Sequence, residues 1–280
     1  MRVFVSVDIE GVTGLVSWSQ CGGPNSSHYD WMYARRMMTH DANAAIRGAR
    51  SGGATHIVLK DSHGSSRNLL IDELEPGVEL ISGTGPHPGG MMTGIDSTFD
   101  CAMLVGYHGR AGTQDGVMEH TISGSIHRMW INGQESGELA MSIATAGTFG
   151  VPLVMVSSDD KGCAEAASLV PGIKTAQTKI GMGRYIARLA HPDQTRVLIE
   201  SAAQQGVQSA PDIKPWRPSE PVHIKIEHNQ SEQCDYSSLI PGWTRVDAYA
   251  YEGKFPTWAD AHRATRVAMA YSSLSSQASK

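Results

Sequence analysis

Acidic and imidazole side chains follow three predicted strands, each near the point where a strand ends. In chain order they are Asp8, Glu10, Asp61, His63 and His108. In an open α/β sheet, ligands bind at the carboxyl ends of the strands, so these side chains are expected to lie at one edge. Carboxylate oxygens and imidazole nitrogens form ligand shells that suit zinc first and manganese, cobalt or iron next. The pattern therefore predicts a metal site.

The spacing of Asp8 and Glu10 favours two metal ions over one. Residues i and i+2 of an extended chain point to the same side. Two neighbouring carboxylates repel each other unless a proton or a cation neutralises them. A short carboxylate that bridges two cations, with a second carboxylate beside it, is typical of a two-metal site. The four cysteines are at least 60 residues apart and form no thiolate site, which favours reduced thiols in a cytosolic protein; they are Cys21, Cys101, Cys163 and Cys234.

Alternating strands and helices must position these groups. Strands are predicted at Arg2–Val7, His56–Lys60, Val78–Ile81, Ala102–Val105, Leu153–Ser157 and Thr175–Ile180. Helices are predicted at Tyr29–Arg50, Glu135–Phe149, Asp159–Leu169, Gly183–Leu189 and Pro192–Gln205. Strands that alternate with helices indicate a parallel sheet with helices on both faces. The fold class is therefore α/β, with a three-layer α/β/α core and a largely parallel, mixed sheet.

A Pro-rich connector separates this core from a smaller C-terminal module. Residues 211–221 contain four prolines, which makes that stretch stiff and extended. We expect a metal-binding catalytic domain over 1–210 and a smaller α+β module over 222–280, packed on the core. The module's expected elements are strands at Val222–His228 and Arg245–Tyr251 and a helix at Thr257–Ser273. A hairpin is expected around Asn132-Gly133, a dipeptide typical of tight turns.

Composition excludes several classes of protein. The 280 residues carry a net charge of −5, with 40% apolar and 18% charged residues, which is typical of a folded domain and not of a disordered chain. A charge balance of this kind argues against nucleic-acid binding. The longest apolar stretches, Cys101–Val105 and Val151–Val156, are far shorter than the roughly 20 residues that span a bilayer. Asp8 and Glu10 interrupt any signal-peptide pattern, so we expect a cytoplasmic protein without membrane contact.

An ordered series of motifs resembles the D-aminopeptidase family, whose members are dizinc peptidases. The series covers nearly the whole chain in the family's order. It consists of Ser6–Gly14 (SVDIEGVTG), Asp61-Ser62-His63, Leu80–Gly83, Gly106-Tyr107-His108, Gly116–His120, Ile131-Asn132, Gly137-Glu138-Leu139, Pro152–Val156, Asp159-Asp160 and Leu239–Gly242.

This resemblance implies a role for each candidate residue. The implied ligands of two Zn²⁺ per subunit are Asp8, Glu10, His63, His108 and Glu138. Asp8 matches the family's bridging aspartate. His120 matches the proposed catalytic histidine, which is not a ligand. Asp61 is expected to orient His63 without binding a metal ion itself.

The implied activity is aminopeptidase hydrolysis of the first peptide bond of short peptides with D-alanine-type N-termini. A metal-bridging hydroxide would attack the carbonyl carbon, and the family assembles as pentameric rings stacked into decamers. Two other readings stay open at this point. One is a different metal-dependent amidase or esterase acting on a small amino-containing substrate. The other is a non-catalytic peptide-binding protein linked to dipeptide uptake, against which the retained His120 argues.

Overall fold

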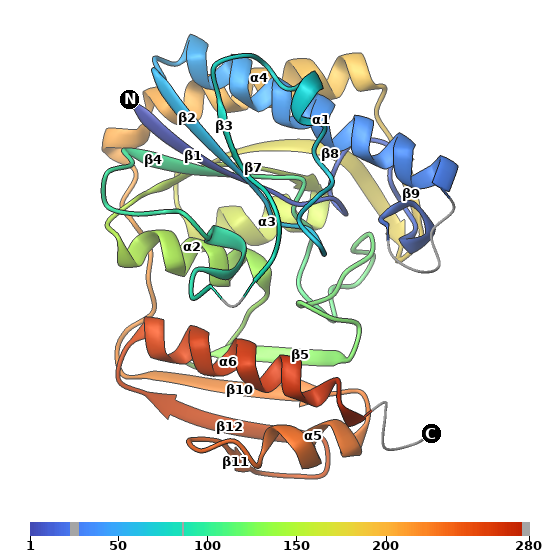
Figure 1. The fold of residues 1–280 in the computed structure, drawn as a ribbon, viewed down its shortest axis with the longest axis vertical. Helices are drawn as coiled ribbons and strands as arrows, with labels where there is room; N and C mark the ends of the chain where they lie inside the picture. The colour runs from blue at the N-terminus through green and yellow to red at the C-terminus, as the bar shows by residue number, and fades with distance from the viewer. Residues whose placement is uncertain (23–27, 86, 276–280) are drawn as a thin grey trace.

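A seven-stranded sheet forms the centre of the larger, upper part of the molecule (Figure 1). The computed structural model describes residues 1–22, 28–85 and 87–275. The strand order is β3-β2-β1-β4-β7-β8-β9, and every neighbouring pair is parallel except β8 and β9. The strands are β1 (Arg2–Val7), β2 (His56–Asp61), β3 (Glu79–Ile81), β4 (Cys101–Val105), β7 (Leu153–Asp159), β8 (Lys174–Gly183) and β9 (Ile186–Leu189).

Helices cover both faces of this sheet. Helices α1 (His28–Ser51) and α4 (Pro192–Gln208) pack on each other over one face, and α2 (Glu138–Thr148) and α3 (Asp160–Leu169) lie on the other (Figure 1). The close approach of α1 to α4 depends on Gly48, where a Cβ atom would lie 2.2 Å from the carbonyl oxygen of Glu200. The predicted three-layer α/β/α core is confirmed.

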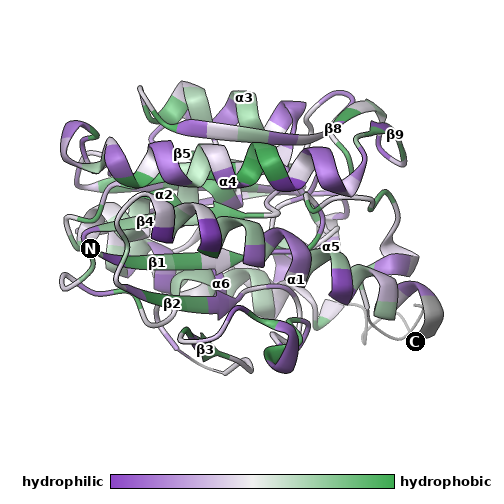
Figure 2. Ribbon diagram, turned by 90° about the horizontal axis from the view of Figure 1, so that it is seen from above, coloured by the Kyte–Doolittle hydropathy of each residue, from purple (hydrophilic) through white to green (hydrophobic). Residues whose placement is uncertain are grey.

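The central strands are apolar because both of their faces are covered. In β1, the side chains of Val3, Phe4, Val5 and Val7 are fully buried. Figure 2 shows β1 in green along most of its length, whereas the outer helices carry mixed colours. A run without polar alternation is typical of a parallel strand between two helix layers. The core strands thus hold their ends, and the side chains on them, in fixed positions.

A second, antiparallel sheet has the order β11-β12-β10-β5-β6. Its strands are β5 (Ile126–Ile131), β6 (Gln134–Glu135), β10 (Val222–His228), β11 (Thr244–Arg245) and β12 (Ala250–Phe255), with helices α5 (Ser231–Ser237) and α6 (Trp258–Ser272) packed on it (Figure 1). The expected turn joins β5 to β6, with Asn132 and Gly133 both at positive φ. Strands β5 and β6 precede the connector, so residues from both sides of 211–221 build this sheet. The division into 1–210 and 222–280 remains a proposal.

Several elements differ from the expectation. The segment Gly183–Leu189, expected to be helical, contains strand β9, which returns antiparallel along β8 after a turn at Gly183. The strand expected at Arg245–Tyr251 is displaced to Ala250–Phe255, and α5 was not expected. Short 3₁₀ turns complete the described elements, at Trp18–Gln20, Ile71–Glu73, Gly90–Met92 and Ala210–Asp212. None of the described helices combines the length and apolar character that crossing a bilayer requires.

Candidate metal centre

The metal-type side chains lie where three adjacent strands end. Asp8 follows β1, His63 lies two residues after β2, and His108 lies three residues after β4. Because β1 lies between β2 and β4, the three loops emerge side by side. Backbone hydrogen bonds extend the pairing into these loops, from Asp8 N to Val105 O and from Ser62 N to Val7 O, each 2.8 Å.

Two glycines allow the loops after β1 and β4 to approach this closely. A Cβ atom at Gly11 would lie 1.7 Å from the carbonyl oxygen of Tyr107, which no side chain tolerates. Gly106 has φ +70, and a Cβ there would lie 2.4 Å from the carbonyl oxygen of Asp8. The glycines of these two motifs are therefore required by backbone contact.

The structure brings the five predicted ligands into one buried cluster. His63 Nδ1 lies 3.3 Å from Asp8 Oδ1 and 3.1 Å from Glu10 Oε1. His108 Nε2 lies 3.6 Å from Asp8 Oδ2 and 3.4 Å from Oε1 of Glu138, the first residue of α2. The two oxygens of Asp8 thus face two different histidines.

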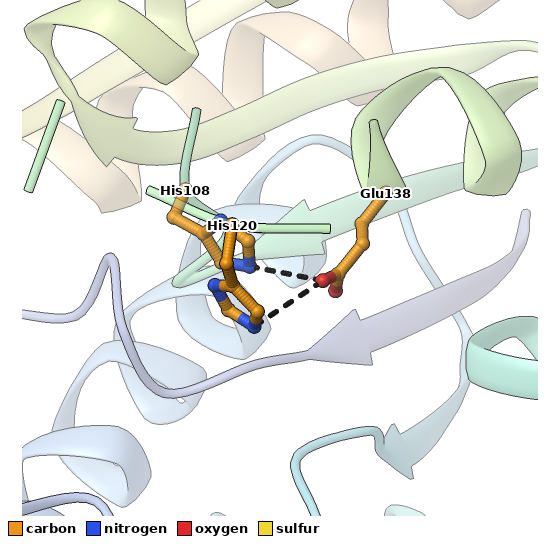
Figure 3. Close-up of side chains that lie close together, drawn as sticks. All are labelled: His108, His120 and Glu138. Carbon is orange, nitrogen blue, oxygen red and sulfur yellow. Dashed lines mark ion pairs between the residues drawn. The ribbon is translucent and has the colours of Figure 1, made fainter. Parts of the chain in front are cut away.

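His120 joins the same cluster (Figure 3). Its Nε2 atom lies 3.4 Å from Glu138 Oε1, and its ring stacks on that of His108 with centroids 4.1 Å apart. The indole ring of Trp18 packs edge-on against the other side, at 4.9 Å. Glu138 Oε1 also accepts a hydrogen bond from Ile122 N at 2.6 Å. His120 therefore has a fixed position between the buried cluster and the cavity beside it.

Each of the three imidazole rings has one nitrogen against a backbone carbonyl oxygen. The pairs are His63 Nε2 with Cys21 O (2.8 Å), His108 Nδ1 with Gly109 O (3.0 Å) and His120 Nδ1 with Met118 O (3.0 Å). A carbonyl oxygen can only accept, so the nitrogen facing it carries the proton. The other nitrogen of each ring faces the carboxylates. This arrangement orients an imidazole for binding a cation.

Asp61 fixes the backbone of the loop that carries His63 through hydrogen bonds. Its carboxylate accepts hydrogen bonds from the backbone N–H groups of Asn68 and Leu69, at 2.5 and 2.8 Å. The Asn68 side chain donates from Nδ2 to Asp61 Oδ1 at 3.0 Å and to His63 O at 2.8 Å. The partner of the His63 ring itself is the carbonyl of Cys21. No sequence pattern could identify that partner, because every residue has a carbonyl.

Burial and mutual repulsion make the carboxylates of this cluster unusual. Burial, with the nearby charge of Glu10, raises the pKa of Asp8 to about 7. Burial also acts to raise the pKa of Glu10, but the opposite charge and hydrogen bond of His63 outweigh it and hold that pKa well below its usual value. The pKa of His63 rises well above its usual value despite burial, because Glu10 and Asp8 face it. Such a cluster attracts positive charge.

Three buried polar atoms of the cluster have no hydrogen-bond partner among the described residues, namely Asp8 Oδ2, Glu10 Oε2 and His108 Nε2. An orphaned buried polar atom is costly, and a cation between these atoms would satisfy them. In the described part of the chain, two groups offer ligand atoms within 4.8 Å of one another. They are Asp8, Glu10 and His108, and His108, His120 and Glu138. The donor set, oxygen and nitrogen only, fits two neighbouring divalent metal ions.

Lys179 of β8 holds the loop after β1 in place, a role that the sequence analysis did not predict. Its side chain is 1% exposed, and Nζ donates to the carbonyl oxygens of Glu10 and Leu15, both at 2.7 Å. Burial lowers its pKa to about 8. A lysine inside an otherwise strand-like run is the only sequence signal for this role. Lys179 clamps the segment that carries Glu10.

A cavity of about 650 Å³ borders the cluster, and Asp8, Glu10, His63, His120 and Glu138 all contribute to its wall. A sequence profile for D-aminopeptidases matches residues 1–267. The chain belongs to the D-aminopeptidase family.

Individual members of the D-aminopeptidase family are similar along most of this chain. A D-aminopeptidase of Bacillus subtilis (strain 168) is 33% identical over 242 residues, which cover 86% of each protein. The solved structure of the zinc-dependent D-aminopeptidase DppA from Bacillus subtilis, described as a self-compartmentalizing protease, superimposes with a TM-score of 0.91. It is 30% identical in sequence, and the match covers 98% of both chains. The family assignment from the ordered motifs is confirmed.

Proposed function

We propose that this protein is a zinc-dependent aminopeptidase that removes D-alanine-type residues from the N-termini of short peptides. Membership of the D-aminopeptidase family and the similarity to a zinc-dependent D-aminopeptidase support this proposal. The observation that carries it is the buried cluster, in which Asp8, Glu10 and His108 each direct an unpartnered atom into the same space.

We assign the metal ligands from the directions of these atoms. In this proposal the two Zn²⁺ ions are held by Asp8, Glu10, His63, His108 and Glu138. Asp8 would contribute to both sites, because its Oδ1 faces His63 and its Oδ2 faces His108. Bound zinc polarises a carbonyl group and lowers the pKa of water from 15.7 toward about 7.

His120 and Asp61 have supporting roles in this proposal. His120 Nδ1–H is held by Met118 O, which leaves Nε2 free to accept a proton and then pass it to the leaving amine. Such a role contributes about 10²–10⁴-fold in rate. Asp61 keeps His63 in place through Asn68.

We also propose a homo-oligomer built from pentameric rings stacked into decamers, located in the cytoplasm. The structural relative is described as self-compartmentalizing, which supports an assembly. All four cysteines are buried free thiols, as expected in a reducing compartment. Size-exclusion chromatography with light scattering measures the assembly directly, and a monomeric mass would contradict it.

The activity is tested with D-Ala-p-nitroanilide and its L isomer. The protein is assayed as purified, after a chelator, and after zinc is restored. We expect hydrolysis of the D isomer that the chelator abolishes and zinc restores. Zinc binding without hydrolysis of either isomer would favour a different amidase or esterase. Saturable peptide binding without zinc or product would favour a peptide-binding protein.

A further inference from the structure

Among the described residues, three cationic side chains line the cavity beside the metal centre, and they differ in how their charge is satisfied. They are Lys60, Arg184 and Arg266. A cation that lines a binding cavity and lacks an acidic partner is available to an anionic group of a ligand.

Two of these cations are already engaged by the protein. Arg184 Nε lies 3.4 Å from Glu119 Oε1, and Arg184 Nη2 donates to the carbonyl oxygen of the same residue at 3.0 Å. Lys60 is 3% exposed, its Nζ donates to the carbonyl oxygens of Asp61 and Gly83 at 2.5 and 3.1 Å, and the negative charge of Asp61 acts on it. Neither is placed to give its full charge to a ligand.

Arg266 is different. This half-buried residue of α6 donates from Nη1 to the carbonyl oxygen of His87 at 2.7 Å. Among the residues that the structure describes, no carboxylate lies within 4.0 Å of its guanidinium. Burial lowers the pKa of Arg266 and no acidic neighbour opposes that effect, but a guanidinium stays charged at neutral pH.

The groups around Arg266 offer no negative charge. His262, one turn earlier on α6, also lines the cavity and faces Pro88 O through Nδ1 at 3.1 Å. Burial lowers the pKa of His262 to about 4, so it is neutral at pH 7. Gly90 lies against both side chains, and a Cβ there would be 3.1 Å from His262 and 3.3 Å from Arg266. The glycine leaves the guanidinium room beside the loop.

We infer that Arg266 binds the C-terminal carboxylate of the peptide substrate and selects short peptides with a free C-terminus. This inference rests on the proposed aminopeptidase function. The N-terminal end of the peptide would lie at the metal centre, where the first peptide bond is cut, and Arg266 would bind the negative charge at the other end of the peptide. The planar guanidinium fork matches a carboxylate and forms a specific pair with it.

The size of the cavity agrees with a short peptide. Along α2, the wall includes Glu138 in the first turn and Met141, Ser142 and Thr145 further on. The seven helical steps from Glu138 to Thr145 extend about 10 Å. An extended peptide covers about 3.3–3.6 Å per residue, so that length corresponds to about three residues. A volume of about 650 Å³ holds a peptide of this size.

The test compares D-Ala-Gly-Gly with its C-terminal amide, which differs only in the charge that Arg266 would bind. With the zinc-loaded wild type, we expect kcat/KM for the free acid to exceed that for the amide by about 10- to 100-fold. Arg266→Met should raise KM for the acid until this preference disappears, with a much smaller change for the amide. Arg266→Lys should keep part of the preference, because it retains charge without the fork.

Arg263→Met is the matched control. Arg263 lies on the same helix but is exposed and pairs with Asp260 at 2.8 Å, so its loss should leave both substrates unaffected. Equal kcat/KM for acid and amide in the wild type would overturn the inference. So would an equal loss for both substrates in a folded Arg266→Met variant.

A binding measurement separates this inference from the proposed function. Isothermal titration of the acid and the amide into zinc-loaded His120→Ala, with and without Arg266→Lys, reports on carboxylate recognition with little turnover. Tighter binding of the acid than of the amide by His120→Ala, weakened when Arg266→Lys is added, would support the inference even if neither peptide were cleaved. Equal binding of acid and amide would refute it. Absence of cleavage would count against the proposed function alone.

Discussion

Lys179→Met tests whether a buried lysine holds the metal-binding segment in place. Lys179 Nζ makes two hydrogen bonds of 2.7 Å, to the carbonyl oxygens of Glu10 and Leu15. Hydrogen bonds that involve a charged group contribute about 1.5–3 kcal/mol each, so the variant loses about 3–6 kcal/mol. It also no longer buries an ammonium group.

Removing the buried ammonium group also removes the free-energy cost of burying it, which partly offsets the loss of the two hydrogen bonds. Burial lowers the pKa of Lys179 from 10.5 to about 8, which corresponds to about 3 kcal/mol. The net destabilisation is therefore about 0–3 kcal/mol, and the variant should fold. The segment Glu10–Leu15 loses its clamp, however, and Glu10 is one of the proposed ligands. Losing a group that orients a ligand lowers metal affinity by about 10–100-fold.

Two assays check these numbers. Urea unfolding gives the change in stability, and zinc titration against a competing chelator gives the change in affinity. Lys174→Met, at the start of the same strand, is the control and should change neither quantity. A Lys179→Met protein that folds and binds zinc as tightly as the wild type would refute the clamp. A loss of stability above 5 kcal/mol would refute the energy balance.

Three further changes test other parts of the structure. His120→Ala should lower kcat by about 10²–10⁴-fold and leave zinc content unchanged, as measured by elemental analysis; loss of zinc would make His120 a ligand. Gly11→Ala places a Cβ 1.7 Å from Tyr107 O, so the free energy of unfolding should fall by about 2–4 kcal/mol, whereas Gly124→Ala, with open space around it, should have no effect. Burial lowers the pKa of His228 to about 4, so its unfolded form binds more protons below pH 6.5. Its contribution to the free energy of unfolding is complete above pH 6.5 and falls by about 2 kcal/mol between pH 7 and pH 5. Urea unfolding at these two pH values should show a smaller fall for His228→Phe.

The layout of the core could be predicted because its signals are local. Strand β1 is a short run dominated by valine and phenylalanine, and Pro192 begins α4 as a proline in the first helical turn should. The metal-type residues could be found because strand ends of a parallel sheet meet at one edge, which makes Asp8 and His108 neighbours although 100 residues separate them.

The elements that were not predicted depend on distant partners. Strand β9 forms because Lys179 and Leu189 pair across a turn, which the composition of Gly183–Leu189 does not encode. Strands β5 and β6 belong to the second sheet because β10, about 90 residues later, pairs with β5. The clamp by Lys179 and the carbonyl that faces His63 are tertiary contacts of the same kind.

Zinc-edge anomalous diffraction from crystals of the zinc-loaded protein would show whether two metal ions lie at this site. We expect two zinc peaks per chain between the ends of β2, β1 and β4, both within bonding distance of Asp8, with His63 at one and His108 at the other. A single peak, or zinc absent from these carboxylates in fully loaded protein, would contradict this expectation.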